Sequence, residues 1–180
     1  MHFDPASVQS VRIRKDANYE GVRVTLVGTL ADARCSVQID IGYGDAITPA
    51  PERVAFPVLL VDTETPTLRA YPVYTVIAEK YQAIVSLGMA NTRMKDYFDL
   101  WFLAAHAEIE PDLLAQAIAA TFQRRATALP TAAPLGLTST FGEDPAKQQQ
   151  WRAFLSKSKL VAPSLTEVMP RLRRLFGLLD

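Results

Sequence analysis

Two kinds of hydrophobic periodicity follow one another in this chain, and their order constrains the fold more than any other feature. Three early segments alternate between apolar and polar side chains, as half-buried strands do: residues 7–14, 21–30 and 34–41. In the third segment Ile39 and Ile41 share one face, while Asp40 lies on the other. Because the segments are neighbours in sequence, an antiparallel meander is their simplest arrangement.

Further along the chain, apolar residues recur every three to four positions, which is typical of amphipathic helices. The predicted helices are two within residues 71–103, then one each over 112–123, 145–157 and 164–177. A proline-rich connector precedes them; within it, residues 56–61 can add an edge strand, because Pro57 has no backbone donor. Residues 124–144 are expected to form a loop. The sequence therefore predicts an α+β fold, with an antiparallel sheet region over residues 1–72 and a helical region over residues 73–180.

The two central helices carry charges within their apolar stripes. Lys80 lies among apolar positions of the first helix, and the second helix contains Lys95, Asp96 and Asp99. Asp96 and Asp99 are three residues apart and share a face, and Lys95 can reach Asp99 at the i,i+4 spacing. Between the helices, Gly88 is expected to end the first, and Asn91 or Thr92 to cap the second.

The composition excludes several classes of protein. Nineteen basic and nineteen acidic residues cancel, so contact with nucleic acid would depend on a local patch. One cysteine excludes an internal disulfide, and two histidines with one cysteine exclude a zinc cluster built by this chain alone. No apolar run approaches the ~20 residues of a membrane span, and no signal peptide is recognisable. We therefore expect a cytoplasmic protein without membrane contact.

Several motifs together resemble the AbiEii/AbiGii family of nucleotidyltransferase toxins from type IV toxin–antitoxin systems. They are EGVRVTL, VQIDIGYGD, the AEK and R-x-KD-x-x-DL patterns of the central helices, ATFQRR and QQWRAFL. The resemblance covers nearly the whole chain. It implies a polymerase beta-like nucleotidyltransferase fold and Mg²⁺-dependent transfer of a nucleotide from an NTP to an acceptor such as tRNA. It also implies neutralisation by a cognate antitoxin.

The resemblance assigns roles to five residues. Asp40 matches the third metal-binding carboxylate of the family, although an exposed strand-end aspartate is the alternative. Lys80 corresponds to a lysine of the active-site region and is expected to contact nucleotide phosphates; otherwise it extends to the surface along an apolar helix. Lys95 and Asp96 are carried over as catalytic residues, with Arg93 as a further phosphate contact. The alternative for Lys95 is a solvated ion pair with Asp99, worth about 0.3–0.5 kcal/mol.

One family motif is missing, because no aspartate in this sequence is followed two residues later by another. The Asp-x-Asp pair would supply the other metal ligands, since Mg²⁺ prefers clustered carboxylates. We therefore expect a chain that begins partway through the fold and is inactive alone, which leaves open whether it is an enzyme. The alternative function is a catalytically dead module that binds an antitoxin or a partner chain. An uncovered sheet edge favours such a partner or a homodimer.

Overall fold

The computed structural model describes residues 1–13, 21–59 and 62–178, and the chain divides into two compact units, Met1–Asp45 and Ala46–Asp180. The first unit contains strands only, and the second contains a short hairpin and the helices. The α+β class, with antiparallel strands followed by helices, is confirmed. Residue 72 marks the change from strands to helices, whereas the compact units divide at residue 45.

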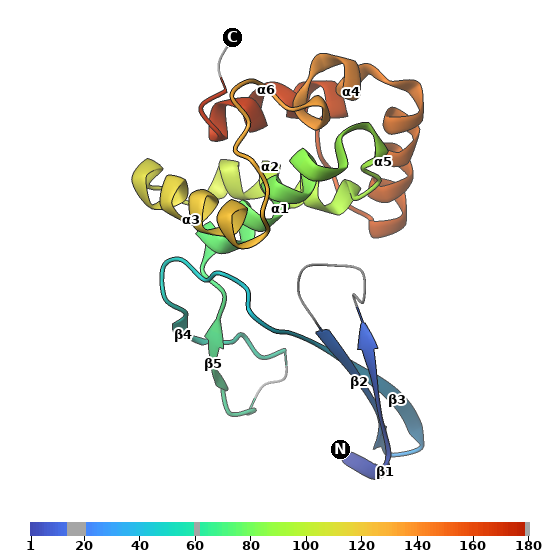
Figure 1. Ribbon diagram of the computed structural model, residues 1–180. Helices are drawn as coiled ribbons and strands as arrows, with labels where there is room; N and C mark the ends of the chain where they lie inside the picture. The colour runs from blue at the N-terminus through green and yellow to red at the C-terminus, as the bar shows by residue number, and fades with distance from the viewer. Residues whose placement is uncertain (14–20, 60–61, 179–180) are drawn as a thin grey trace. The chain divides into compact units, whose positions relative to one another are not determined.

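The first unit is one antiparallel sheet in the order β1-β2-β3 (Figure 1). Its strands are β1 (His2–Ile13), β2 (Gly21–Leu30) and β3 (Ala33–Gly42). The register pairs Val24 with Ile39 and Arg23 with Asp40, so aliphatic residues share one face and polar residues the other. The predicted meander and its alternation are therefore confirmed. The sequence of residues 18–21 also suits a hairpin turn between the first two strands, but of these residues the structure describes only Gly21.

Strand β1 is longer than predicted, because a bulge lets it continue through Pro5. The pairing with β2 shifts between Asp4 and Gln9. Inside this irregular stretch, the Ser7 hydroxyl donates to Asp4 O at 2.6 Å and accepts from Val27 N at 2.8 Å. These bonds replace ladder bonds that a regular strand would make. The sequence predicted a start at residue 7, whereas the strand begins at His2.

A second hairpin opens the other unit. Strands β4 (Glu52–Ala55) and β5 (Thr67–Ala70) pair antiparallel, and Phe56 N donates to Pro66 O at 2.9 Å beyond the last ladder pair. The strand predicted over residues 56–61 is therefore wrong: residues 56–59 are not in a strand, and 60–61 lie outside the described residues. Pro57 lacks the N–H that would extend the ladder past Phe56.

Helices make up the rest of this unit, and the described residues contain six α-helices and two short 3₁₀ turns. They are α1 (Val73–Leu87), η1 (Gly88–Ala90), α2 (Met94–His106), α3 (Pro111–Arg124), η2 (Leu135–Leu137), α4 (Ser139–Glu143), α5 (Pro145–Ser158) and α6 (Leu165–Leu175). Helices α1 and α3 pack together, and α2 packs against α5 and α6. The expected loop over residues 124–144 is wrong at 139–143, where Thr138 caps α4 by accepting from Phe141 N.

The core of the second unit is aromatic. Tyr97 and Trp151 are buried, and Tyr97 stacks on Phe141 with ring centroids 5.1 Å apart. The Tyr97 hydroxyl donates to Gly136 O at 3.0 Å. Gly136 has to be glycine, since a Cβ there would lie 2.8 Å from Ile84 Cγ2. The helices that carry the charged residues are therefore held by a close-packed interior.

The break between α1 and α2 is confirmed in part. Gly88 ends α1 with a positive φ of 49°, as expected. The residue at the start of α2 is Arg93, which makes no side-chain cap. The expectation that Asn91 or Thr92 caps α2 is therefore wrong. Asn91 has another task, because its side chain is fully buried and accepts from Arg93 N at 2.9 Å.

Candidate functional site

A lysine of α1 meets two carboxylates of α2 inside the helical unit. Lys80 Nζ lies 2.7 Å from Asp96 Oδ1 and 2.8 Å from Asp99 Oδ2. Its side chain is 16% exposed and that of Asp96 only 4%. Asp96 and Asp99 share a helix face, as their spacing predicted, and both point at the same ammonium group. We call Lys80, Asp96 and Asp99, with the flanking Arg93 and Lys95, the ion-pair cluster.

Mutual attraction favours the charged forms of Lys80 and Asp99. Burial by itself lowers the pKa of Lys80, but its hydrogen bonds to Asp96 and Asp99 outweigh burial and raise that pKa above its ordinary value. Burial likewise raises the pKa of Asp99, yet the bonds from Lys80 and Lys95 prevail and lower it. Lys80 is therefore an ammonium ion at neutral pH. An ammonium has three N–H donors, and within the described residues two of them are used.

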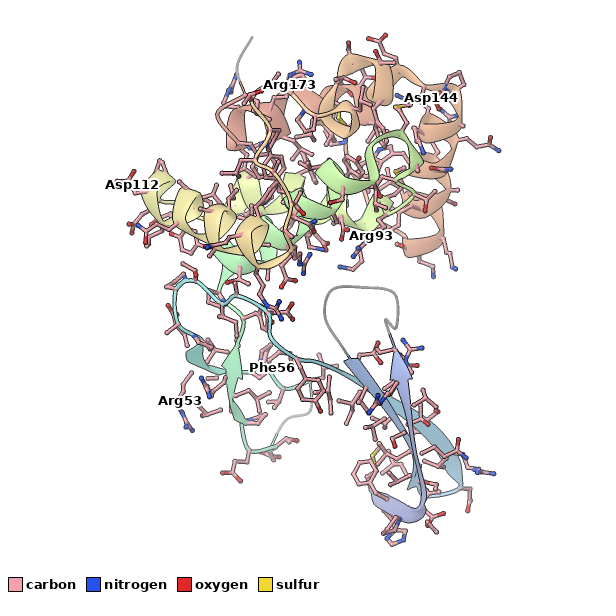
Figure 2. The ribbon with its side chains drawn as sticks, in the orientation of Figure 1. Arg53, Phe56, Arg93, Asp112, Asp144 and Arg173 are labelled. Carbon is pink, nitrogen blue, oxygen red and sulfur yellow. The ribbon has the colours of Figure 1, made fainter. Side chains whose placement is uncertain are left out.

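Two exposed cations flank the buried part of the cluster. Arg93 Nε lies 2.8 Å from Asp96 Oδ2, and its side chain is 59% exposed and projects from the helical surface (Figure 2). Lys95 pairs with Asp99, and its side chain is 71% exposed. The apolar residues around Lys95 and Asp96 in the sequence predict partial burial of both side chains, which is wrong for Lys95 and right for Asp96. Three cations against two carboxylates leave one net positive charge at the surface.

The contact between Arg93 and Asp96 has a particular geometry. Asp96 Oδ2 is buried and accepts no hydrogen bond from the described residues, although the Arg93 guanidinium is close. The two groups are thus held by charge without an aligned bond. A guanidinium held in this way can turn toward an anionic ligand at little cost.

The turn before α2 fixes the backbone of Arg93. The side-chain oxygen of Asn91 accepts from Arg93 N, and its backbone carbonyl accepts from Lys147 Nζ at 2.9 Å. Lys147 comes from α5 and is buried. Its ammonium group also lies 5.2 Å from the centroid of the Phe141 ring. Residues from distant parts of the chain therefore position the start of α2, where Arg93, Lys95 and Asp96 lie.

A second polar network joins α1 to α3. Arg125 donates to Gln82 Oε1 at 2.9 Å, and its other guanidinium nitrogen lies 3.4 Å from Glu79. Gln82 also donates to Thr127 at 2.8 Å. Glu79, the acidic residue of the AEK pattern, thus pairs with a basic residue of the same unit. Gln82 also donates to the nearby Ser86, but the sequence did not predict its contacts with Thr127 and Arg125, which lie more than forty residues away.

The remaining predicted site residue, Asp40, belongs to the sheet unit. Arg23 of β2 donates to both of its carboxylate oxygens, at 2.7 and 2.8 Å. The hydrogen bond to Asp40 raises the pKa of Arg23 above its ordinary value. Both side chains are more than one-third exposed. Asp40 thus lies on the polar face of the sheet, while Lys80, Arg93, Lys95 and Asp96 come together in the helical unit.

The described residues do not suit a resident Mg²⁺ ion by themselves. Within residues 1–13, 21–59 and 62–178, no three His, Cys, Asp or Glu side chains come close enough to bind a metal. Both oxygens of Asp40 face Arg23, and the oxygens of Asp96 and Asp99 face cations. Mg²⁺ prefers several oxygen ligands free of competing cations.

Among the described helices, none has the length and apolar character required to cross a membrane.

Comparison with known proteins gives one match. The family model for the nucleotidyl transferase AbiEii toxin of a type IV toxin–antitoxin system matches residues 2–176. No curated protein and no solved structure matches the chain. The matched range includes both units and every member of the ion-pair cluster.

Proposed function

Because the chain belongs to the AbiEii family of nucleotidyl transferase toxins from type IV toxin–antitoxin systems, we propose that it takes part in transfer of a nucleotide from an NTP to an RNA acceptor such as tRNA. The ion-pair cluster is the observation that carries this proposal. It combines a largely buried lysine, charged at neutral pH, with two exposed cations. Triphosphates need such cations, since catalysis of phosphoryl transfer depends on positioning and charge stabilisation.

Each member of the cluster has a distinct task in this proposal. Arg93 and Lys95 bind phosphate oxygens, Arg93 through its planar guanidinium and Lys95 as a mobile point charge. Lys80 donates its third N–H to the phosphates. Asp96 and Asp99 are positioning residues that hold Lys80 charged and fixed. The catalytic role expected for Asp96 thus becomes electrostatic support for Lys80.

Mg²⁺ enters this proposal only as part of the Mg²⁺–NTP substrate. The resemblance implies that Asp40 is a metal-binding carboxylate, and this role stays a prediction for the sheet unit taken by itself. The ion pair of Asp40 with Arg23 is exposed and therefore easily exchanged for another cation.

Family membership also supports proposals about the protein partner of the chain and its location in the cell. We propose a cognate antitoxin as the protein partner and the cytoplasm, where NTPs and tRNA occur, as the site of action. The second candidate function is an inactive module that binds the antitoxin or a second copy of the chain. The apolar face of the sheet favours it, because Ile39 is 48% and Ile41 38% exposed.

A transfer assay separates these candidates. The full chain, with and without its antitoxin, is incubated with tRNA and α-³²P-labelled NTP, and labelled RNA is resolved on a gel. We expect labelling to fall at least tenfold in the double variant Arg93→Gln/Lys95→Gln. Arg152→Gln, an exposed arginine of α5 without an ion pair among the described residues, is the matched control and should label normally. Absence of label under every condition, with the antitoxin still bound, would favour the inactive module.

A further inference from the structure

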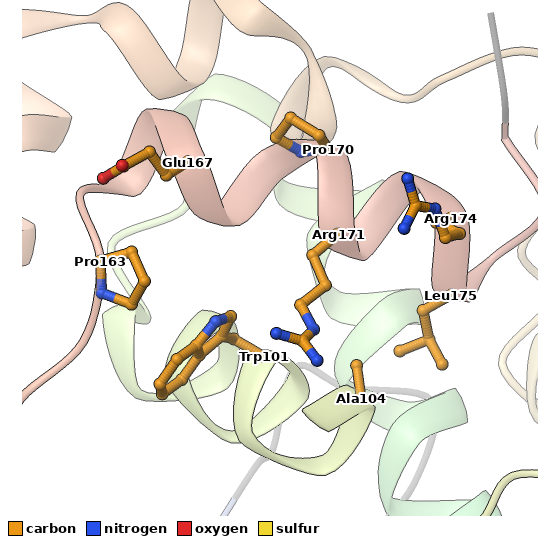
Figure 3. A pocket seen from close by; sticks show the side chains of 8 residues that line it. All are labelled: Trp101, Ala104, Pro163, Glu167, Pro170, Arg171, Arg174 and Leu175. Carbon is orange, nitrogen blue, oxygen red and sulfur yellow. The ribbon is translucent and has the colours of Figure 1, made fainter. Parts of the chain in front are cut away.

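A cavity between α2 and α6 lies apart from the ion-pair cluster. It has a volume of about 560 Å³, and Figure 3 shows Trp101 and Ala104 of α2 on one side and Arg171 and Arg174 of α6 on the other. Trp101 follows Asp99 by two residues, which places the two side chains about 160° apart around the helix. The cavity and the cluster therefore use opposite faces of α2.

The cavity is positively charged. Arg171 and Arg174 are exposed, and no acidic group in the described part of the chain pairs with them. Glu167, the acidic residue on its wall, is already engaged by the cap of α6: its carboxylate accepts from Ser164 N at 2.9 Å and from the Ser164 hydroxyl at 2.6 Å. Figure 3 shows Glu167 directed away from Arg171, so this carboxylate does not neutralise it.

An aromatic ring lies beside these arginines. Trp101 is partly buried, leans against Phe98 with centroids 5.7 Å apart, and leaves part of its indole on the cavity wall (Figure 3). Arg171 extends from α6 toward that ring. The indole N–H of Trp101 has no acceptor within the described residues. The other tryptophan differs in both respects, since Trp151 is buried and donates to Pro163 O at 3.0 Å.

We propose that this cavity binds one nucleotide of a single-stranded RNA segment, with its base against Trp101 and its phosphate on Arg171 and Arg174. A partly exposed indole and guanidinium groups are the two features that single-stranded nucleic acid sites combine. The volume is in the range of small-ligand sites and suits one nucleotide better than a folded partner. The identification of the strand as the RNA acceptor rests on the proposed function. The nucleotide in the cavity is then an upstream one of the acceptor strand and does not itself receive the transferred group, because the NTP lies on the opposite face of α2.

Direct RNA binding tests this proposal without any transfer reaction. Fluorescence anisotropy of a dye-labelled oligoadenylate of five nucleotides is measured with the full chain, without NTP, over a series of salt concentrations. Arg171→Gln/Arg174→Gln should weaken binding at least tenfold and reduce the log–log salt slope by about 0.7, since the two arginines share one phosphate and each phosphate contact on a single strand contributes about 0.7. Trp101→Leu should weaken binding by about fivefold or more, and Trp101→Phe by less, because stacking survives on any aromatic ring. Arg152→Gln is the control and should bind like the wild type.

Competition experiments distinguish an RNA strand from other anionic ligands that the cavity could bind. Unlabelled RNA should displace the probe at lower concentration than AMP, inorganic phosphate or poly-glutamate. Equal displacement by poly-glutamate would contradict a nucleotide site and indicate an acidic peptide site. Equal displacement by AMP would contradict the proposal that the bound nucleotide belongs to an RNA strand. Equal displacement by phosphate would contradict a contribution of the base to binding. Unchanged affinity in the Trp101→Leu or double-arginine variant would also overturn the proposal.

The two proposals fail in different ways. Arg93→Gln/Lys95→Gln should bind the RNA probe normally, because the ion-pair cluster lies on the other face of α2. If the RNA site is confirmed and the chain binds no NTP, the nucleotidyl transfer proposal fails alone. If NTP binds and RNA affinity does not respond to Arg171 and Arg174, the cavity proposal fails alone.

Discussion

Removal of the lysine between the two helices should destabilise the helical unit strongly. Lys80→Met keeps the length of the side chain and leaves Asp96, whose side chain is 4% exposed, without its ammonium partner. Breaking a buried ion pair from one side costs about 3–5 kcal/mol. The lower end applies here, because Arg93 still lies 2.8 Å from Asp96 and Lys95 still pairs with Asp99. We therefore expect a loss of about 3 kcal/mol in the free energy of unfolding.

Urea denaturation measures this loss. Both tryptophans, Trp101 and Trp151, belong to the helical unit, so their fluorescence reports its unfolding alone. With a slope of about 2 kcal/mol/M, the urea midpoint should fall by about 1.5 M. Lys95→Met is the matched control: the same substitution at a 71% exposed lysine should cost no more than about 0.5 kcal/mol. Equal midpoints for the two variants would refute the buried-pair interpretation.

The difference in the free energy of unfolding between wild type and Lys80→Met should depend on pH in a defined direction. The folded pKa of Asp99 lies below its ordinary value of 3.8, so its contribution is complete above that pH and is lost as the pH falls through the lower, folded value. The folded pKa of Lys80 lies above its ordinary value of 10.5, so its contribution is lost only as the pH rises past 10.5. The gap between wild type and Lys80→Met should therefore be constant from pH 5 to 9, which urea titrations at several pH values can check, and should narrow below about pH 4.

Three further substitutions test other parts of the structure. Gly136→Ala places a Cβ 2.8 Å from Ile84 Cγ2 and should cost about 1–3 kcal/mol in urea unfolding; a neutral result would contradict this packing. Lys147→Met leaves the carbonyl of buried Asn91 without its donor and should cost about 1–3 kcal/mol, while an unchanged midpoint would show that this carbonyl finds another partner. Arg23→Ala should leave the tryptophan-detected midpoint unchanged, since this residue belongs to the other unit; a shift would contradict independent unfolding.

The local features of the fold were readable from the sequence because they depend on neighbouring residues. Alternation predicted that Ile39 and Asp40 lie on opposite faces of a strand, and the register confirms it. Pro111 and Pro145 marked the starts of α3 and α5, because proline suits the first helical turn. The strand Glu52–Ala55 was missed, since four residues are too few for alternation to stand out.

The site was only partly predictable, because its contacts join distant segments. The i,i+3 spacing placed Asp96 and Asp99 on one face, but their shared contact with Lys80 depends on how α1 packs beside α2. The cavity joins Trp101 to Arg171, seventy residues apart, and no local pattern indicates that proximity. In the sequence alone, Arg171 and Arg174 are typical of a solvated helix face; the packing of α6 against α2 brings them to the cavity.

Titration calorimetry with Mg²⁺–NTP tests the central claim most directly, because it asks only whether the ion-pair cluster binds a triphosphate. We predict saturable binding to the wild-type chain, at least tenfold weaker binding to Arg93→Gln/Lys95→Gln, and wild-type binding to Arg152→Gln. No binding at millimolar Mg²⁺–NTP, or equal binding by all three proteins, would contradict the account of this cluster as the nucleotide site.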